Sequence, residues 1–99
     1  MNERRRERLS AVIKEILPAF FRQELILPNG VLISVLYAES MTSGTRVTVY
    51  VSIFPDNLRA DIAKILEMSE NRAAHFLRAR LRTKYSPSIH FVVSEEGLA

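Results

Sequence analysis

Cysteine is absent from the 99 residues of this chain, and histidine and glycine are scarce. Without cysteine there are no disulfides or thiolate metal sites, and the composition suits the reducing cytoplasm, where we expect the protein. The two histidines, His75 and His90, have no carboxylate at metal-ligand spacing. The three glycines lie well apart, so no glycine-rich phosphate loop exists. We therefore expect no enzyme, no metal and no cofactor.

Long apolar runs are also missing. The longest is far shorter than the roughly 20 residues that cross a bilayer. No apolar segment follows the basic N-terminus, as a secretory signal would require. Hydrophobic residues make up 47% of the chain, which is enough for one core. We expect a monomer with a single domain over residues 1–99, in which residues 1–4 and 94–99 are frayed.

The basic residues are concentrated in two segments, although the net charge is only +3. Residues 1–8 carry a net charge of +2, and residues 72–84 carry +5 without any acidic residue. Eleven of the fourteen basic residues are arginine, whose planar fork suits phosphate contacts and base stacking. From charge alone, a nucleic-acid surface and a solvated helix face remain equally good interpretations.

The first half of the chain has the pattern of a helix followed by a hairpin. Apolar spacings of three and four predict a helix over residues 5–24, with a kink at Pro18. A turn at Asn29-Gly30 precedes two alternating segments, residues 31–38 and 46–54. Such alternation is typical of a half-buried antiparallel pair, here joined through Ser43-Gly44. The sheet face predicted to be open to water carries Thr48, Tyr50 and Ser52.

The second half predicts two helices and a last strand. Asp56 or Asn57 is expected to cap the first helix, and Ser69 a second one over about residues 70–84. The apolar residues expected to be buried are Leu58, Ile62, Ile65 and Leu66, then Ala73, Phe76, Leu77 and Leu81, then Ile89, Phe91 and Val93 in the strand. The order is α-β-β-α-α-β. A right-handed crossover makes the last two strands parallel if they are neighbours. We predict an α+β domain of two layers, with the helices on one face of a three-stranded mixed sheet.

Four stretches, taken in order, resemble the ribosome-binding factor A family, bacterial small-subunit assembly factors with a type II KH-like fold. They are the helix from Arg8-Leu9 to Phe20-Phe21, the strand Val47–Ser52, the segment Ala73–Arg78 followed by Leu81, and the segment Pro87–Phe91. The family usually has Ala-x-Gly at the kink between its last two helices. Ala73 and His75 occupy these positions here, with His75 in place of glycine.

The resemblance implies an RNA-binding assembly factor that acts in maturation of the 30S subunit and processing of 16S rRNA. Its expected partners are 16S rRNA or its precursor and the 30S subunit, with no membrane and no small-molecule substrate. The resemblance directs attention to the Ala73–Leu81 helix and to the basic N-terminal helix.

The candidate RNA-binding residues are basic and lie in these two segments: Arg72, Arg78, Arg82 and Lys84, and Arg4, Arg5 and Arg8. Arg72, Arg78, Arg82 and His75 fall on the helix side away from the apolar stripe, where a basic row can follow a phosphate backbone. Arg80 lies nearer that stripe and is expected to extend along it. Lys84 could instead favour the helix dipole, and Glu3 and Glu7 could pair with the N-terminal arginines.

A second hypothesis is a protein-interaction module on the same fold. Its basic row would bind an acidic protein surface, and Tyr50 on the open sheet face could contact a partner. Tyr37, Tyr50 and Tyr85 are expected to pack within the protein rather than stack on RNA bases, because the sheet lacks the paired aromatics of an RNA-recognition motif.

Overall fold

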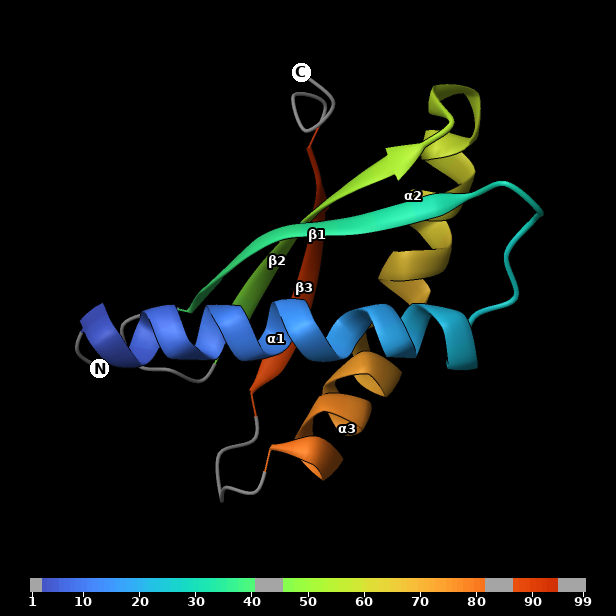
Figure 1. The fold of residues 1–99 in the computed structure, drawn as a ribbon. Coiled ribbons are helices and arrows are strands. Elements are labelled where there is room, and N and C mark those ends of the chain that lie inside the picture. Colours follow the sequence, from blue (N-terminus) through green and yellow to red (C-terminus); the bar gives the residue numbers. More distant parts are fainter. Residues whose placement is uncertain (1–2, 41–45, 82–86, 95–99) are drawn as a thin grey trace.

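The structure is a computed structural model that describes residues 3–40, 46–81 and 87–94. The elements follow the predicted order (Figure 1): α1 (Glu3–Glu24), β1 (Leu32–Ser40), β2 (Arg46–Phe54), the short 3-10 helix η1 (Asp56–Leu58), α2 (Arg59–Met68), α3 (Glu70–Arg80) and β3 (Ser88–Val93). The expected connection at Ser43-Gly44 and the tail after Ser94 lie outside the described residues. No helix among the described residues is long and apolar enough to span a membrane.

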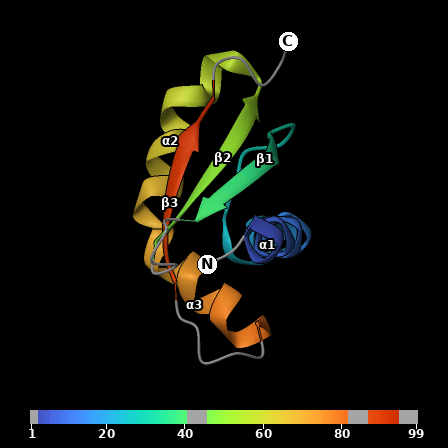
Figure 2. The same cartoon turned by 90° about the vertical axis from the view of Figure 1, so that its left-hand side faces the viewer.

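The three strands form one mixed sheet with β2 in the middle, as Figure 2 shows. β1 pairs with β2 in antiparallel register, and β3 pairs with β2 in parallel register. The parallel pairing follows from the connection, because α2 and α3 carry the chain from the end of β2 back to the start of β3. The predicted mixed sheet is confirmed.

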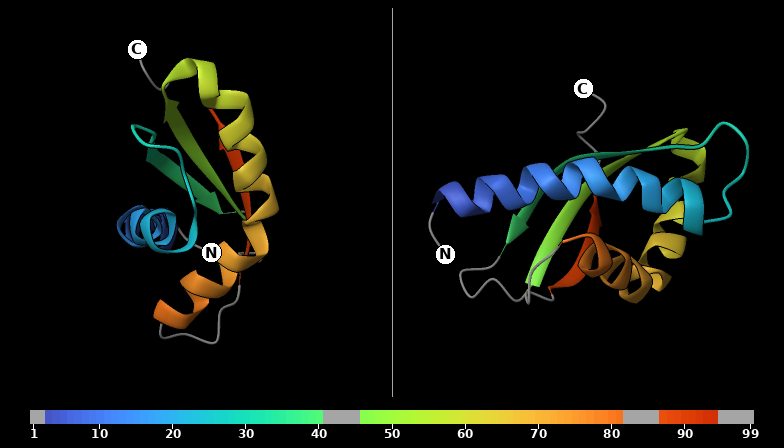
Figure 3. Two further views of the ribbon diagram at one scale, coloured as in Figure 1. Left: turned by 90° about the vertical axis from the view of Figure 1, so that its right-hand side faces the viewer. Right: turned by 60° about the horizontal axis from the view of Figure 1, so that its bottom comes forward.

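The core lies between the inner face of this sheet and the helices. Val47, Val49 and Val51 of β2 are fully buried, and Ile53 is nearly so. They share one apolar cluster with buried residues of every α-helix: Ile13, Leu17 and Phe20 of α1, Ile62 and Leu66 of α2, and Ala73, Phe76 and Leu77 of α3. All three α-helices therefore pack on one side of the sheet, and Figure 3 shows α1 lying across the strands.

A bulge in β1 shifts by one residue which side chains face the core. The register with β2 shifts between Val35 and Tyr37, so Leu36 is the extra residue. Before the bulge Val35 faces the core, and after it Ala38 and Ser40 take the inward positions. The predicted alternation over residues 31–38 thus holds only as far as Val35. The shift places Tyr37 directly opposite Tyr50.

α1 continues through Pro18 without a restart, as a single helix of 22 residues. Its N-terminal residues Glu3 and Arg4 are helical, although we predicted fraying up to residue 4. After α1, Gly30 has φ +85 at the predicted turn, a backbone angle that only glycine adopts freely.

The predicted helix caps are wrong in their chemistry. Asp56 and Asn57 lie within η1, and no side chain caps the start of η1 or α2. Asp56 instead accepts a hydrogen bond at Oδ1 from Arg59 Nη2 at 2.8 Å. Ser69 does stand at the N-cap position of α3, but its hydroxyl donates back to the Leu66 carbonyl at 2.9 Å. The Ser69 hydroxyl, which we expected to cap α3, thus bonds the Leu66 carbonyl of the preceding helix instead.

The break between α2 and α3 falls at Ser69, which corrects the expected kink at Ala73 and His75. Both of those residues lie inside α3, and no described residue other than glycine has positive φ, so His75 needs no special backbone angle. α3 also ends earlier than the predicted residue 84. Leu81 takes extended dihedrals while it packs against the core, so the helix stops at Arg80.

The outer face of β2 is less open than predicted. Thr48 and Tyr50 are partly exposed, but Ser52 is only 6% exposed. The central strand is paired on both sides here, and the Ser94 amide donates to the carbonyl of Val51 next to Ser52. The expectation that Ser52 faces water is therefore wrong.

Candidate nucleic-acid interface

Among the described residues, the basic and the apolar side chains of α3 lie on different sides of the helix, as predicted. Arg72, His75 and Arg78 are exposed, whereas Phe76 and Leu77 are buried. The helix repeat causes this, because residues three and four apart share one side. The predicted site residues Arg82 and Lys84 lie outside the described residues.

Arg78 and His75 form a pair on the exposed face of α3. Arg78 Nη2 lies 3.0 Å from His75 Nδ1. The guanidinium carries only donors, so the histidine nitrogen is the acceptor in this contact. The contact holds Arg78, a candidate RNA-binding residue, against His75 on the same helix face.

Arg72 connects α3 to the end of α1. Its Nη1 donates to the backbone carbonyl of Glu24 at 3.3 Å. Carbonyls at a helix C-terminus lack intrahelical partners and carry partial negative charge, so a guanidinium is a favourable partner. Arg72 is therefore partly a structural residue as well as a surface cation.

Arg80 lies flat on Phe76. Its guanidinium carbon is 3.4 Å from the centroid of the ring, and its Nη1 donates to the Phe76 carbonyl at 3.2 Å. The prediction that Arg80 extends along the apolar stripe is confirmed. Cation–π attraction and the hydrogen bond together fix the plane of the guanidinium.

The N-terminal arginines lie at the opposite end of α1 from Arg72. Arg4 and Arg8 are exposed on the first turns of α1. Arg5 lies in the same helix, but its side chain is outside what the structure describes. A helix rises about 1.5 Å per residue, so Arg4 is roughly 30 Å from Glu24, where Arg72 binds. Arg4 and Arg72, one from each predicted basic group, are therefore not brought together.

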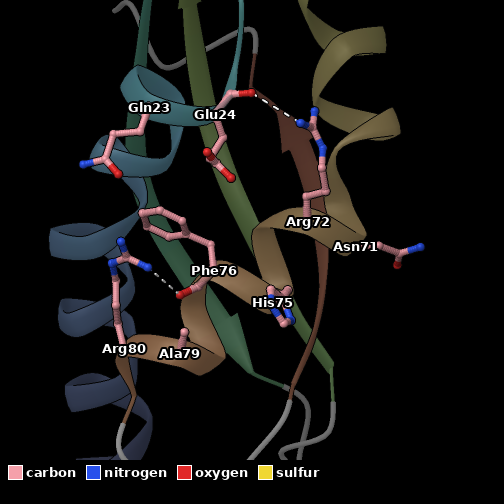
Figure 4. Close-up of a pocket in the computed structure, with 8 residues that line it drawn as sticks. All are labelled: Gln23, Glu24, Asn71, Arg72, His75, Phe76, Ala79 and Arg80. Carbon is pink, nitrogen blue, oxygen red and sulfur yellow. Dashed lines mark hydrogen bonds between the residues drawn. The ribbon is translucent and has the colours of Figure 1, made fainter.

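A groove of about 600 Å³ lies between the last turn of α1 and the outer side of α3 (Figure 4). It is lined by Gln23 and Glu24 of α1 and by Asn71, Arg72, His75, Phe76, Ala79 and Arg80 of α3. Figure 4 shows the Glu24 carboxylate and the Phe76 ring in its upper half, with Arg80 beside the ring. Among the described residues, no group of three or more potential ligands could hold a metal ion.

The outer sheet face carries an aromatic pair that sequence reasoning missed. The rings of Tyr37 and Tyr50 are stacked, with centroids 4.4 Å apart and planes 20° apart. Burial raises the pKa of Tyr50 above its ordinary value, and the nearby Glu39 carboxylate and Tyr37 raise it further. We expected no paired aromatic side chains on this sheet face. The pair forms because the bulge at Leu36 places Tyr37 directly opposite Tyr50.

Taken together, the mixed three-stranded sheet, the helices on one face and the basic last helix define a small KH-like domain. No family model matches the sequence, and no curated protein matches it either. Solved structures do match over almost the whole chain.

Two of these structures are of ribosome-binding factor A, and a third is of a protein described as a candidate ribosome-binding factor A. The crystal structure from Thermus thermophilus is 23% identical, with a TM-score of 0.71, over 89% of this chain and 93% of that one. A homology model of the Thermus thermophilus factor, fitted into the cryo-EM map of its complex with the 30S subunit, is 28% identical, with a TM-score of 0.69, over 94% and 99%. A Thermotoga maritima solution structure is 20% identical, with a TM-score of 0.75, over 93% and 89%. This chain is therefore similar to ribosome-binding factor A over almost its whole length, as the sequence resemblance predicted.

Proposed function

We propose that this chain binds the small ribosomal subunit or its precursor RNA and acts in maturation of the 30S subunit and processing of 16S rRNA. The observation that carries the proposal is the match to the Thermus thermophilus factor in its 30S complex, which extends over 94% of this chain. The two chains share one fold over nearly their whole length, which supports a shared partner.

The charge of the described surface supports RNA as the ligand. α3 presents Arg72 and Arg78 to solvent, and α1 presents Arg4 and Arg8. Each contact of such a side chain with a phosphate releases a condensed counterion, which favours binding at moderate salt. The proposed role is binding, and no reaction is part of it.

The direct test is RNA recovery with the tagged protein. We expect ribosomal RNA of the small subunit, including precursor with unprocessed ends, to be enriched over RNA of the large subunit. In a bacterium without its own ribosome-binding factor A, expression of this chain should convert 16S precursor to mature 16S rRNA. Equal recovery of both ribosomal RNAs, with no change in precursor, would contradict the proposal.

A protein-docking function has one observation in its favour. Leu32 and Phe54 lie opposite each other on the outer sheet face and are 65% and 54% exposed. Exposed apolar side chains of this size, on the same sheet face as the Tyr37–Tyr50 stack, suit a protein surface. A partner retained after ribonuclease treatment, and lost in Leu32→Ser, would support this second candidate.

A further inference from the structure

We propose that the groove between the end of α1 and α3 binds one unpaired RNA base, which stacks on the guanidinium of Arg80. The inference deepens the proposed function, and its choice of RNA as ligand depends on that function. The groove has a wall from each of two helices, and hydrogen bonds hold several of the side chains that line it.

The stacking surface is preformed. One face of the Arg80 guanidinium lies on the Phe76 ring at 3.4 Å, and Nη1 is held by the Phe76 carbonyl. Phe76 is itself 7% exposed and makes an edge contact with Phe20, with centroids 5.4 Å apart. The guanidinium is thus a flat plate fixed on a buried support, while Arg80 as a whole remains exposed. Single-stranded RNA is recognised by stacking of its bases on aromatic rings and on arginine planes.

The lining of the groove fits a base better than a phosphate. Glu24 contributes a carboxylate, and no hydrogen bond or ion pair among the described residues occupies it. An ionised carboxylate accepts hydrogen bonds from the N–H groups at the edge of a base but repels a phosphate. Gln23 adds an amide that both donates and accepts. Figure 4 shows both side chains on the α1 side of the groove, across from α3.

The arginines of α3 are placed to hold the phosphates that flank the base. Arg72 lines the groove, and Arg78 is bound at 3.0 Å to His75, which also lines it. Between these residues and Arg80 stands Ala79, an exposed residue with a small side chain. A methyl group there lets the sugar of a nucleotide approach the helix closely. The arrangement places the base at the Arg80 end and phosphates at the His75 end.

The test separates stacking from charge. A short labelled oligouridine with one central adenosine is compared with the same RNA in which the central residue lacks its base. We expect wild-type protein to bind the intact RNA roughly tenfold more tightly, in line with the stacking contribution of one base. Arg80→Lys keeps the charge but loses the plane, so it should bind both RNAs with nearly equal affinity.

Two further variants make the result specific. Arg78→Lys is the matched control, because the Arg78 guanidinium bonds a histidine nitrogen rather than lying on a phenylalanine. It should retain the preference for the intact RNA. Ala79→Gln places a longer side chain in the groove from an exposed helical position, where folding is not disturbed, and should abolish that preference.

An unchanged tenfold preference in Arg80→Lys, no preference in wild type, or no binding of either RNA would each overturn the inference. Co-sedimentation with the small subunit tests the proposed function separately. If that co-sedimentation is absent while the wild-type preference for the base persists, the proposed function fails and the base site stands. If it is present while the preference is absent, the base site alone fails.

Discussion

At the scale of single residues, the main surprise is the Tyr37–Tyr50 stack. The alternation of β2 correctly predicted that Tyr50 projects from the outer face of the sheet. The position of Tyr37 could not be predicted, because uninterrupted alternation after Val35 would turn Leu36 outward and Tyr37 inward, and residue type alone does not reveal the bulge. Only the cross-strand register shows that the two rings are opposite each other. The outward direction of the Tyr50 side chain was therefore predictable, but its pairing with Tyr37 was not.

The raised pKa of Tyr50 predicts how stability changes at high pH. Its ordinary value is 10.0, and burial, followed by Glu39 and Tyr37, raises it in the folded protein. The folded protein holds this proton more tightly than the unfolded chain does. The resulting stability is complete below pH 10.0 and is lost as the pH rises through the higher folded value.

Urea unfolding at a series of pH values checks this expectation. The free energy of unfolding should fall above pH 10.0 in the wild type, and part of that fall should be missing in Tyr50→Phe. Tyr37→Phe keeps the Tyr50 hydroxyl but removes the smaller contribution of Tyr37 to its raised pKa, so most of the fall should remain. Identical pH dependence of the free energy of unfolding in wild type and Tyr50→Phe would show that Tyr50 does not cause the fall.

Gly30 gives a second prediction at this scale. Its φ is +85, and a Cβ at this position would meet nothing within 4 Å. The effect of a side chain is therefore backbone strain alone. Gly30→Ala should lower the free energy of unfolding by about 1 kcal/mol. Gly30→Asn should lower it less, because asparagine tolerates this region better. Equal losses in thermal or urea unfolding would show that the turn relaxes instead.

At the scale of elements, the predictions succeeded where apolar periodicity was strong. The valines of β2 and the stripe of α1 are buried as expected, because each pattern has only one face that can meet the core. Helix ends were less predictable. Ser69 donates to Leu66 instead of capping, and the break moves to Ser69 from the position that the family motif suggested. Helix ends depend on local hydrogen-bond competition, which residue type alone does not decide.

One carboxylate of α3 makes polar contacts with β3. Glu70 Oε2 accepts hydrogen bonds from the Phe91 amide at 2.8 Å and from His90 Nδ1 at 3.1 Å. Glu70→Gln weakens the acceptor, and we expect a loss of about 1 kcal/mol in the free energy of unfolding. Glu67→Gln changes an exposed carboxylate of α2 in the same way and should have almost no effect. Equal effects of the two variants in urea would contradict this role for Glu70.

Helix packing depends on Phe20 at the centre of the core. The side chain is fully buried and contacts the rings of Phe21 and Phe76. Phe20→Ala should reduce the free energy of unfolding by about 3–5 kcal/mol, which combines lost transfer energy and a cavity. Met68→Ala, at a side chain that is 83% exposed, is the control and should stay within about 0.5 kcal/mol of wild type. A small effect of Phe20→Ala would mean that α1 is packed differently.

At the scale of the whole molecule, the basic surface was predictable and the groove was not. Charge and helical spacing together predicted that Arg72 and Arg78 would be exposed. The groove requires Glu24 to meet Arg72, 48 residues further along the chain. Such a contact follows from packing and leaves no local signal. Arg80 was assigned to the apolar stripe correctly, yet its fixed plane became visible only in the folded protein.

The measurement that tests the central claim most directly is sedimentation with ribosomal subunits at low and raised salt. Wild-type protein is compared with Arg78→Glu/Arg82→Glu and with Lys14→Glu/Lys64→Glu, a matched change of charge at exposed lysines of α1 and α2 outside the predicted set. Circular dichroism first establishes that both variants are folded.

We expect wild type and the lysine control to migrate with the small subunit, and the arginine variant to remain at the top of the gradient. About four phosphate contacts to single-stranded RNA predict a log–log salt slope of about −3. Migration of all three proteins at the top of the gradient at low salt, or equal binding of the arginine variant, would contradict the account.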